Sequence, residues 1–214
     1  MIAVPNFSFE ERENFDPFPE STDKYHQWAL ESWRQLDRTF NGGPIRIWNP
    51  GDQGDTNNLT PQGVLDVGFG GNAPDGKYVF LVRSRYTNDV PTDGVNHFEA
   101  AAQILTNTFD NSKFYMLTAK VGRPVGSINY TPDWHGYAVQ LAVGGTNVAG
   151  STYAGSVTGG VVVAQDANTR NVPIDRFVTS TVMYTPNPGD AALAGLPLQI
   201  RLCALESPGT LTNT

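Results

Sequence analysis

The 214-residue chain is poor in charge, in cysteine and in long hydrophobic runs. Charged residues make up only 16% of it, which disfavours both a disordered chain and a fold covered by charged surface helices. No segment approaches the roughly 18 consecutive apolar residues of a membrane span, and the first residues lack the basic and apolar stretches of a signal peptide. The sequence therefore predicts neither a transmembrane helix nor a coiled coil.

Basic residues are fewer than acidic ones, with 14 Lys and Arg against 21 Asp and Glu, and the net charge is −7. Because nucleic-acid binding needs clustered cations, this balance argues against a nucleic-acid partner. Residues 10–23 hold six acids and one arginine, a pattern typical of a solvated loop, with a cation site as the alternative.

The single cysteine, Cys203, cannot form an internal disulfide bond, and it lies in the apolar run Leu198–Leu205. We interpret it as a buried hydrophobic residue, because a reactive thiolate needs an exposed, electropositive site.

Glycine and proline are plentiful, with 22 and 15 residues, and they separate short β-rich runs. This pattern predicts one all-β domain over residues 1–214, built as a sandwich or barrel. The predicted strands are Val64–Phe69, Tyr78–Arg83, Phe98–Thr106, Phe114–Val121, Tyr137–Val143, Val161–Gln165, Phe177–Tyr184 and Leu198–Leu205.

Within these runs, the period-two pattern is clearest in Tyr137–Val143, where large apolar residues alternate with small or polar ones, so one face should pack inward. Phe177–Tyr184 has a polar middle, which a β-bulge or an edge position would explain. In the first 62 residues, Asp23–Leu36 fits a short amphipathic helix, but a strand at Ser32–Leu36 is preferred for Trp33. A further strand is predicted at Ile45–Trp48.

No catalytic constellation is visible, since the three histidines are scattered and no nucleophile elbow, zinc motif or phosphate-binding loop accompanies them. Glu99, Asp110 and Asp133 are candidates for a pair of hydrolytic carboxylates only because they are acids, and no motif connects them. The sequence therefore predicts a protein that is not an enzyme.

Two loops combine aromatic and polar residues in a way that suits ligand binding. The candidate binding residues are Tyr130, Asp133, Trp134 and His135 in the first loop, and Arg85 and Tyr86 in the second. The structural alternative is that Trp134 folds back to cap the open end of the sandwich. Trp28, Trp33 and Trp48 are more typical of core residues.

Several stretches together resemble the galactose-binding-like jelly-roll domains of carbohydrate-binding modules and of exported bacterial proteins of the PEP-CTERM type. The matching pieces include Pro5–Glu10, Ser32–Trp33, Ile47–Pro50, Ala73–Val79, Ala102–Leu105, Phe114–Gly122, Tyr137–Gly145, Phe177–Tyr184 and Pro197–Leu202. The resemblance implies a jelly-roll β-sandwich of two antiparallel sheets, and a structural Ca²⁺ ion held in part by Glu10.

From this resemblance we expect a non-catalytic module that binds a glycan at a cell surface or in extracellular matrix. The alternative is a structural or decoration protein of a phage particle or surface layer. Domains of this kind normally continue into one more strand beyond Thr214, and an unfilled sheet edge would favour contacts with neighbouring subunits in a homo-oligomer or assembly.

Overall fold

A computed structural model gives the fold of the protein. It describes residues 2, 4, 7, 25–27, 33–36, 46–48, 73–76, 79–81, 100–123, 136–149, 156–168, 172–173 and 176–205. These residues form twelve strands and one short helix.

The strands are β1 (Tyr25–Gln27), β2 (Arg34–Leu36), β3 (Arg46–Trp48), β4 (Val79–Leu81), β5 (Ala100–Thr108), β6 (Tyr115–Arg123), β7 (Tyr137–Val143), β8 (Thr146–Val148), β9 (Ser156–Thr158), β10 (Val161–Asn168), β11 (Arg176–Tyr184) and β12 (Pro197–Ala204). The helix in the described part is a 3₁₀ helix, η2 (Pro188–Leu193).

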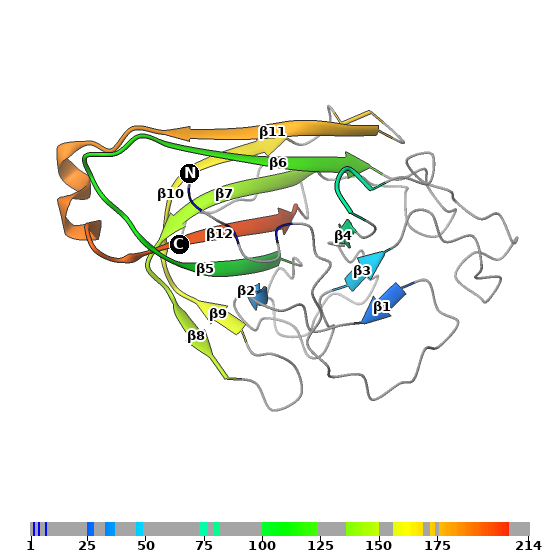
Figure 1. Ribbon diagram of the computed structural model, residues 1–214, viewed down its shortest axis with the longest axis horizontal. Coiled ribbons are helices and arrows are strands. Elements are labelled where there is room, and N and C mark those ends of the chain that lie inside the picture. Colours follow the sequence, from blue (N-terminus) through cyan, green and yellow to red (C-terminus); the bar gives the residue numbers. More distant parts are fainter. Residues whose placement is uncertain are drawn as a thin grey trace, which may run out of the picture.

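The architecture is a β-sandwich of the jelly-roll type, as predicted. The larger sheet has the strand order β10-β7-β12-β5-β2-β9-β8, and the second layer consists of β11 paired with β6. Figure 1 shows β11 and β6 running along one side of β7, β12 and β5. A third sheet joins β1, β3 and β4. All strand pairs are antiparallel except β2 with β9.

The main core lies between the two layers, because each strand turns one set of alternate side chains toward the other sheet. Its buried members are Trp33, Ala101, Leu105, Phe109, Tyr115, Tyr137, Val139, Leu141, Val143, Val172, Val182, Leu198 and Ile200. The prediction that Trp33 belongs to the core is therefore confirmed. The side chains of Trp28 and Trp48 lie outside the described part.

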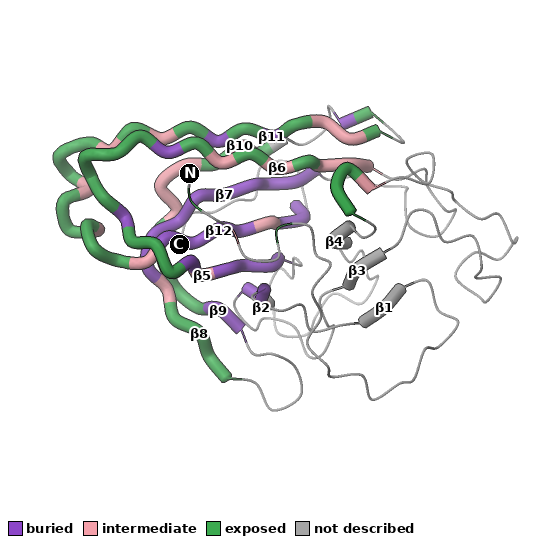
Figure 2. The backbone as a smooth tube through the Cα atoms, viewed as in Figure 1, coloured by how far each residue is buried: buried purple, intermediate pink, exposed green. Residues whose placement is uncertain are grey.

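The other face of the larger sheet is buried as well, which corrects the prediction of one inward face for β7. All seven residues of β7 are buried (Figure 2). The residues that point away from the main core are small or polar, and Ala138 joins a second buried cluster with Leu36, Ala100, Ala102, Val157, Cys203 and Leu205. Small side chains at these positions allow close packing on the second face, so their low hydrophobicity does not mean exposure.

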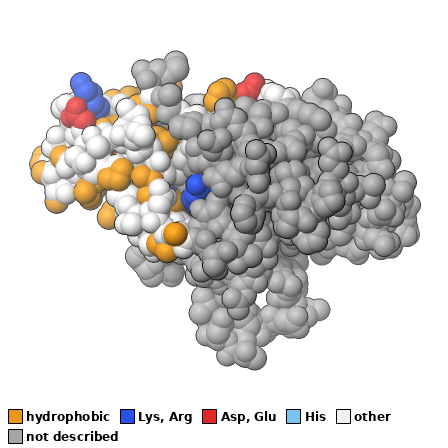
Figure 3. Space-filling model, turned by 60° about the horizontal axis from the view of Figure 1, so that its bottom comes forward, with side chains coloured by type: hydrophobic (Ala, Val, Ile, Leu, Met, Phe, Trp, Pro, Cys, Tyr) orange, Lys and Arg blue, Asp and Glu red, His pale blue; other side chains and the backbone are white. Residues whose placement is uncertain are grey.

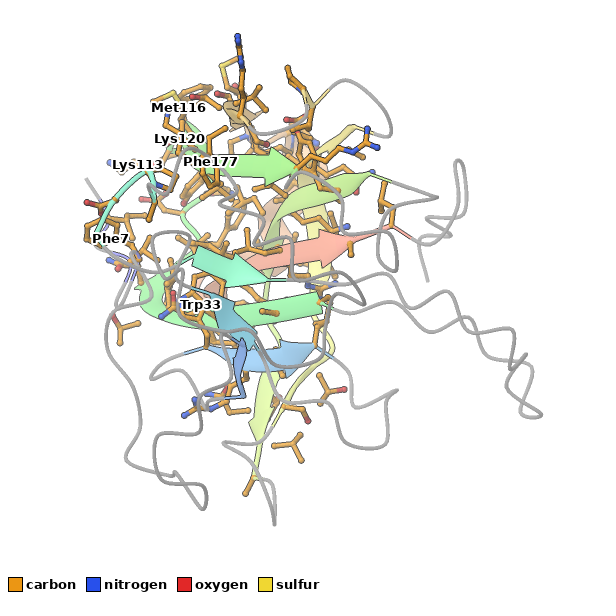
Figure 4. The ribbon with its side chains drawn as sticks, turned by 90° about the vertical axis from the view of Figure 1, so that its right-hand side faces the viewer. Phe7, Trp33, Lys113, Met116, Lys120 and Phe177 are labelled. Atoms are coloured by element: carbon orange, nitrogen blue, oxygen red, sulfur yellow. The ribbon has the colours of Figure 1, made fainter. Side chains whose placement is uncertain are left out.

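The second layer has one covered face and one open face. β11 pairs with β6 over nine residue pairs without a register shift, and it has no other partner strand among the described residues. The edge position predicted for Phe177–Tyr184 is therefore confirmed, and the alternative of a bulge is wrong. Met116 and Lys120 lie on the outer side of β6, away from β5 and β12 (Figure 4).

At one end of the sandwich, which we call the helix end, η2 follows β11. The hydroxyl of Tyr184 donates to Asp190 Oδ2 over 2.5 Å, and the amide of Asn187 donates to the same oxygen over 2.7 Å. Phe109 stacks on Tyr115 with a ring-centre distance of 5.4 Å and also contacts Tyr184. This end is thus closed by a capped helix over an aromatic cluster.

Side chains of β12 hold the turns on either side of β8 and β9. The guanidinium of Arg201 donates to the carbonyl oxygens of Gly159 and Gly160 over 2.8 and 3.2 Å, and Gln199 donates to that of Gly144 over 3.3 Å. Gly144 and Gly145 have positive φ angles of 85° and 93°, which glycine adopts without a steric cost. The strand β8 begins directly after it.

The described strands agree with most of the predicted ones, and the predicted strand Val64–Phe69 lies outside the described residues. The helix allowed over Asp23–Leu36 is wrong where that segment is described, because β1 and β2 are both strands. β2 pairs with β5 on one side and with β9 on the other, as a strand inside a sheet does.

Charged side chains are sparse on the described surface. On the face shown in Figure 3, the coloured side chains are mostly hydrophobic and only isolated ones are charged. No described helix has the length and hydrophobicity to cross a membrane.

Candidate functional site

The candidate site lies at the end of the sandwich opposite η2, which we call the Tyr137 end. β7 and β11 begin there, whereas β6, β10 and β12 end there (Figure 1). All six predicted binding residues, Tyr130, Asp133, Trp134, His135, Arg85 and Tyr86, lie outside the described part of the chain. However, the predicted loop 126–136 leads directly into β7 at Gly136, whose carbonyl oxygen accepts a hydrogen bond from the amide of Leu205 over 3.1 Å.

A carboxylate sits between the two layers at this end. Asp166 of β10 accepts two hydrogen bonds on Oδ2, from the Tyr137 hydroxyl over 3.0 Å and from the Ser180 hydroxyl over 2.6 Å. Tyr137 belongs to the larger sheet and Ser180 to β11, so the carboxylate links the two layers. Both partners are buried, with exposed fractions of 7% and 0%, while Asp166 itself is half-buried.

A register shift in β10 turns Asp166 inward. Val161 pairs with Val143 and Val162 with Ala142, but Ala164 pairs with Leu141, so Val163 is an extra residue in β10. Without this extra residue the alternation would place Asp166 on the other face of the sheet. Irregularities of this kind often occur beside active sites, where they re-aim a side chain. Asp166 therefore faces the main core as a consequence of local backbone geometry.

The surroundings of the carboxylate also affect Tyr137. Burial of the ring, together with the hydrogen bond to Asp166, raises the pKa of Tyr137 above its ordinary value. The phenol consequently stays protonated at neutral pH and acts as a donor to Asp166. A half-buried carboxylate fixed by two protein donors can hold a ligand donor or stabilise positive charge.

The other residues singled out in the sequence do not build a site. Cys203 is buried, as predicted, and burial raises the pKa of its thiol to about 12, so it is not a nucleophile. Asp110 lies in the exposed turn before β6, where it accepts hydrogen bonds from the amide and hydroxyl of Ser112 over 2.9 and 2.7 Å. Glu99 lies outside the described part. No described residue thus pairs with Asp110 in the way that a hydrolytic site requires.

Glu10, the predicted calcium ligand, also lies outside the described residues. Within the described ranges, no three His, Cys, Asp or Glu side chains come together in a group that could bind a metal ion. The described part of the chain therefore contains no protein-built metal cluster.

Comparison with known proteins gives a family match over nearly the whole chain. The family model of HpiC1-like proteins, described as HpiC1 cyclase, matches residues 1–213. No curated protein sequence matches the chain.

Solved structures with the same fold come from Fischerella. The Stig cyclase Fisc from Fischerella sp. TAU, in complex with (3Z)-3-(1-methyl-2-pyrrolidinylidene)-3H-indole, is 21% identical with a TM-score of 0.62, and the match covers 95% of this chain and 87% of that one. A cyclase from Fischerella sp. TAU in complex with 4-(1H-indol-3-yl)butan-2-one is 20% identical with a TM-score of 0.63, with 95% and 87% covered. At these identities the structures establish the fold.

These matches correct the functional interpretation of the sequence. The assignment to carbohydrate-binding modules and PEP-CTERM proteins is wrong as to family, although it was right about the fold. The prediction of a non-catalytic glycan-binding or virion structural protein is wrong, because the matching family is one of cyclases. The predicted partners, a glycan or neighbouring subunits, are wrong as well, because the similar structures contain small indole compounds.

Proposed function

The chain belongs to the HpiC1-like cyclase family, and we propose that it closes a ring within a small molecule that carries an indole. The observation that carries this proposal is the family match over residues 1–213. The compounds named for the two similar cyclases, both built on an indole, support the substrate class.

The Tyr137 end supplies features that such a reaction needs. When an aromatic ring attacks an electrophile in its own side chain, positive charge builds up on the ring, and a carboxylate stabilises this charge most strongly where water is excluded. Asp166 is such a carboxylate, because it faces the apolar core between the layers and is held by Tyr137 and Ser180. We therefore place the reacting molecule beside Asp166.

The loop 126–136 is the second part of this proposal. Trp134 precedes Tyr137 by three residues, so its Cα lies within about 11 Å of the Tyr137 Cα. An indole ring stacks well on a tryptophan or tyrosine side chain. We propose that Trp134 and Tyr130 contact the ligand, a role that suits an aromatic substrate as well as it suits the sugar expected from the sequence.

The test is conversion of acyclic indoles by the purified chain. The panel consists of indoles with unsaturated side chains. The products are separated by liquid chromatography, and their masses are measured by mass spectrometry. Intramolecular addition to a double bond gives an isomer of unchanged mass, so the expected result is a new isomer that heat-denatured protein does not form. Failure to convert or bind any member of the panel would contradict the proposed function.

A structural Ca²⁺ ion, held in part by Glu10, remains part of the proposal. The acid-rich residues 10–23 and the preference of Ca²⁺ for carboxylate oxygens support it. Millimolar Ca²⁺ added to chelator-treated protein should raise the Tm, and Glu10→Gln should reduce this rise. A Tm that does not respond to Ca²⁺ would rule out a calcium site that contributes to stability.

A further inference from the structure

Two of the three methionines of the chain form a cross-strand pair on the open face of the second layer. Met183 of β11 lies opposite Met116 of β6 in the register of the two strands. Their neighbours Leu117 and Val182 belong to the main core, so the alternation of each strand turns the methionine outward, as Figure 4 shows for Met116. The two side chains are 65% and 64% exposed. Because the Cβ atoms of opposite residues on one face lie about 5 Å apart, the two thioethers form one exposed sulfur pair.

The cysteine has the opposite surroundings. Cys203 is buried in the second cluster, on the far face of the larger sheet. Burial raises the pKa of its thiol to about 12, so the thiol stays protonated at neutral pH. Peroxides react with a thiolate that they can reach, and Cys203 offers neither the charge nor the access. Within the described part of the chain, the sulfur atoms that solvent reaches are therefore those of the methionine pair.

We propose that Met116 and Met183 are the site at which peroxides oxidise this protein, and that the fold accommodates the oxidised form. In each step the thioether sulfur attacks one oxygen of hydrogen peroxide. The S–O bond forms as the O–O bond breaks, and the hydroxide that leaves takes the proton of the transferred oxygen. Sulfur is oxidised and the peroxide is reduced, so the products are one methionine sulfoxide and one water for each methionine.

The surroundings of the pair explain why both sulfoxides fit. Neither Met116 nor Met183 belongs to the main core, so oxidation places no polar group in an apolar interior. The next residue pair on the same face is Thr118 with Thr181, and both side chains are exposed. A sulfoxide oxygen accepts hydrogen bonds, and on this face water and hydroxyl groups supply the donors. Oxidation therefore turns an apolar part of the outer face into a polar one and leaves the strand pairing in place.

Graded treatment of the full chain with hydrogen peroxide tests the proposal, with peptide mapping by mass spectrometry as the main measurement. The peptides that contain Met116 and Met183 should each gain one oxygen atom, at least about tenfold faster than the peptide that contains Cys203 is oxidised. The Tm should fall by less than about 2 °C, because a change at an exposed position costs at most about 0.5 kcal/mol. The oxidised protein should also elute earlier from a hydrophobic-interaction column, since its outer face is more polar.

Two variants assign these effects to the pair. The double variant Met116→Leu/Met183→Leu keeps the outer face apolar but removes both sulfur atoms from it, so peroxide should no longer shift its elution. Met1 is present in the wild type and in the variant, so its oxidation cancels in the comparison. Leu198→Met is the matched control for exposure, because Leu198 is 1% exposed and the two side chains are similar in volume. Its new methionine should be oxidised at least about tenfold more slowly than Met116.

Three results would overturn the proposal. The first is oxidation of Cys203 before either methionine of the pair. The second is a methionine at position 198 that reacts as fast as Met116. The third is a larger fall in Tm on oxidation of the wild type that the double variant does not show, because the fold would then not accommodate the sulfoxides. The wild-type peptide map decides the first point even if a variant fails to fold, and no measurement in the series depends on the proposed cyclisation.

Discussion

Both ends of the sandwich contain a tyrosine hydrogen-bonded to an aspartate, but the two pairs are built differently. At the helix end, Tyr184 and the amide of Asn187 bind Asp190, and all three residues belong to one short stretch of chain. At the Tyr137 end, the partners of Asp166 come from two other strands, 29 and 14 residues away in sequence. The first pair caps a surface helix that has no buried residue. The second places a carboxylate between the layers.

This difference shows why residue types alone do not reveal a site. Each aspartate accepts two protein hydrogen bonds on one oxygen. What separates them is position, because Asp190 lies on η2 whereas Asp166 faces the apolar core. We therefore assign a structural role to the helix end and a ligand-binding role to the Tyr137 end.

The largest effect is expected for the aromatic cluster at the helix end. Phe109 is only 1% exposed, so Phe109→Ala should lower the free energy of unfolding by about 3–5 kcal/mol through loss of burial and formation of a cavity. Phe114→Ala is the control, because Phe114 is 59% exposed and its truncation should cost less than about 0.5 kcal/mol. Urea denaturation measures both. If the folded Phe109→Ala protein loses ligand affinity, the separation of roles between the ends fails.

A smaller loss of stability is expected at the Tyr137 end, combined with a loss of binding. Ser180→Ala removes a buried hydrogen bond to the Asp166 carboxylate, which should cost about 1.5–3 kcal/mol. It should also weaken binding of the indole ketone, because the carboxylate loses one of its two anchors.

The matched control is Ser112→Ala, which removes a similar serine–aspartate hydrogen bond from the exposed turn at Asp110. That variant should change neither stability nor affinity appreciably, since exposed hydrogen bonds compete with water. Equal effects of the two variants would mean that the Asp166 site is no more than another surface contact.

The loop before β7 should affect binding without affecting stability. We expect Trp134→Ala to weaken binding of 4-(1H-indol-3-yl)butan-2-one roughly two- to tenfold, because loss of ring stacking costs roughly 0.5–1.5 kcal/mol. Phe114→Ala, at the other end of β6, should leave the affinity unchanged. A large drop in Tm for Trp134→Ala with unchanged affinity would favour the alternative that Trp134 caps the sandwich.

The smallest effect concerns pH. Burial, with the hydrogen bond to Asp190, raises the pKa of Tyr184 from about 10 to about 12. A raised pKa stabilises the folded state fully below pH 10, and this contribution is lost as the pH rises toward 12. Because the pKa of Tyr137 is raised as well, the absorbance of the phenolates near 295 nm should show one late-titrating tyrosine fewer in Tyr184→Phe than in the wild-type protein. If Tyr184 titrates with an ordinary pKa near 10, its hydrogen bond to Asp190 is contradicted.

Much of the fold could be predicted from the sequence, because long strands carry a period-two pattern. Tyr137–Val143 was predicted with the bounds that β7 has. The strands β8 and β9 could not be predicted, since each has three residues and is held by side chains of the distant strand β12. The helix η2 is missing from the predicted elements, although Asn187 and Asp190 form a capping box that signals a helix start.

The site could not be predicted, for a physical reason. The predicted strand Val161–Gln165 stops one residue before Asp166, because a polar pair commonly marks a strand end. The extra residue Val163, which turns Asp166 inward, has no signal in the sequence, since a bulge at valine looks like uninterrupted strand. The enzyme class was also missed, because ring closure can rely on one carboxylate in an apolar space and needs no conspicuous motif.

A crystal structure of the chain with bound 4-(1H-indol-3-yl)butan-2-one tests the central claim most directly. The account predicts the ligand at the Tyr137 end, between the layers and beside the Asp166 carboxylate that Tyr137 and Ser180 hold. Ligand density beside Phe109 and Tyr184 at the helix end, or on the outer face of β6 and β11, would contradict it.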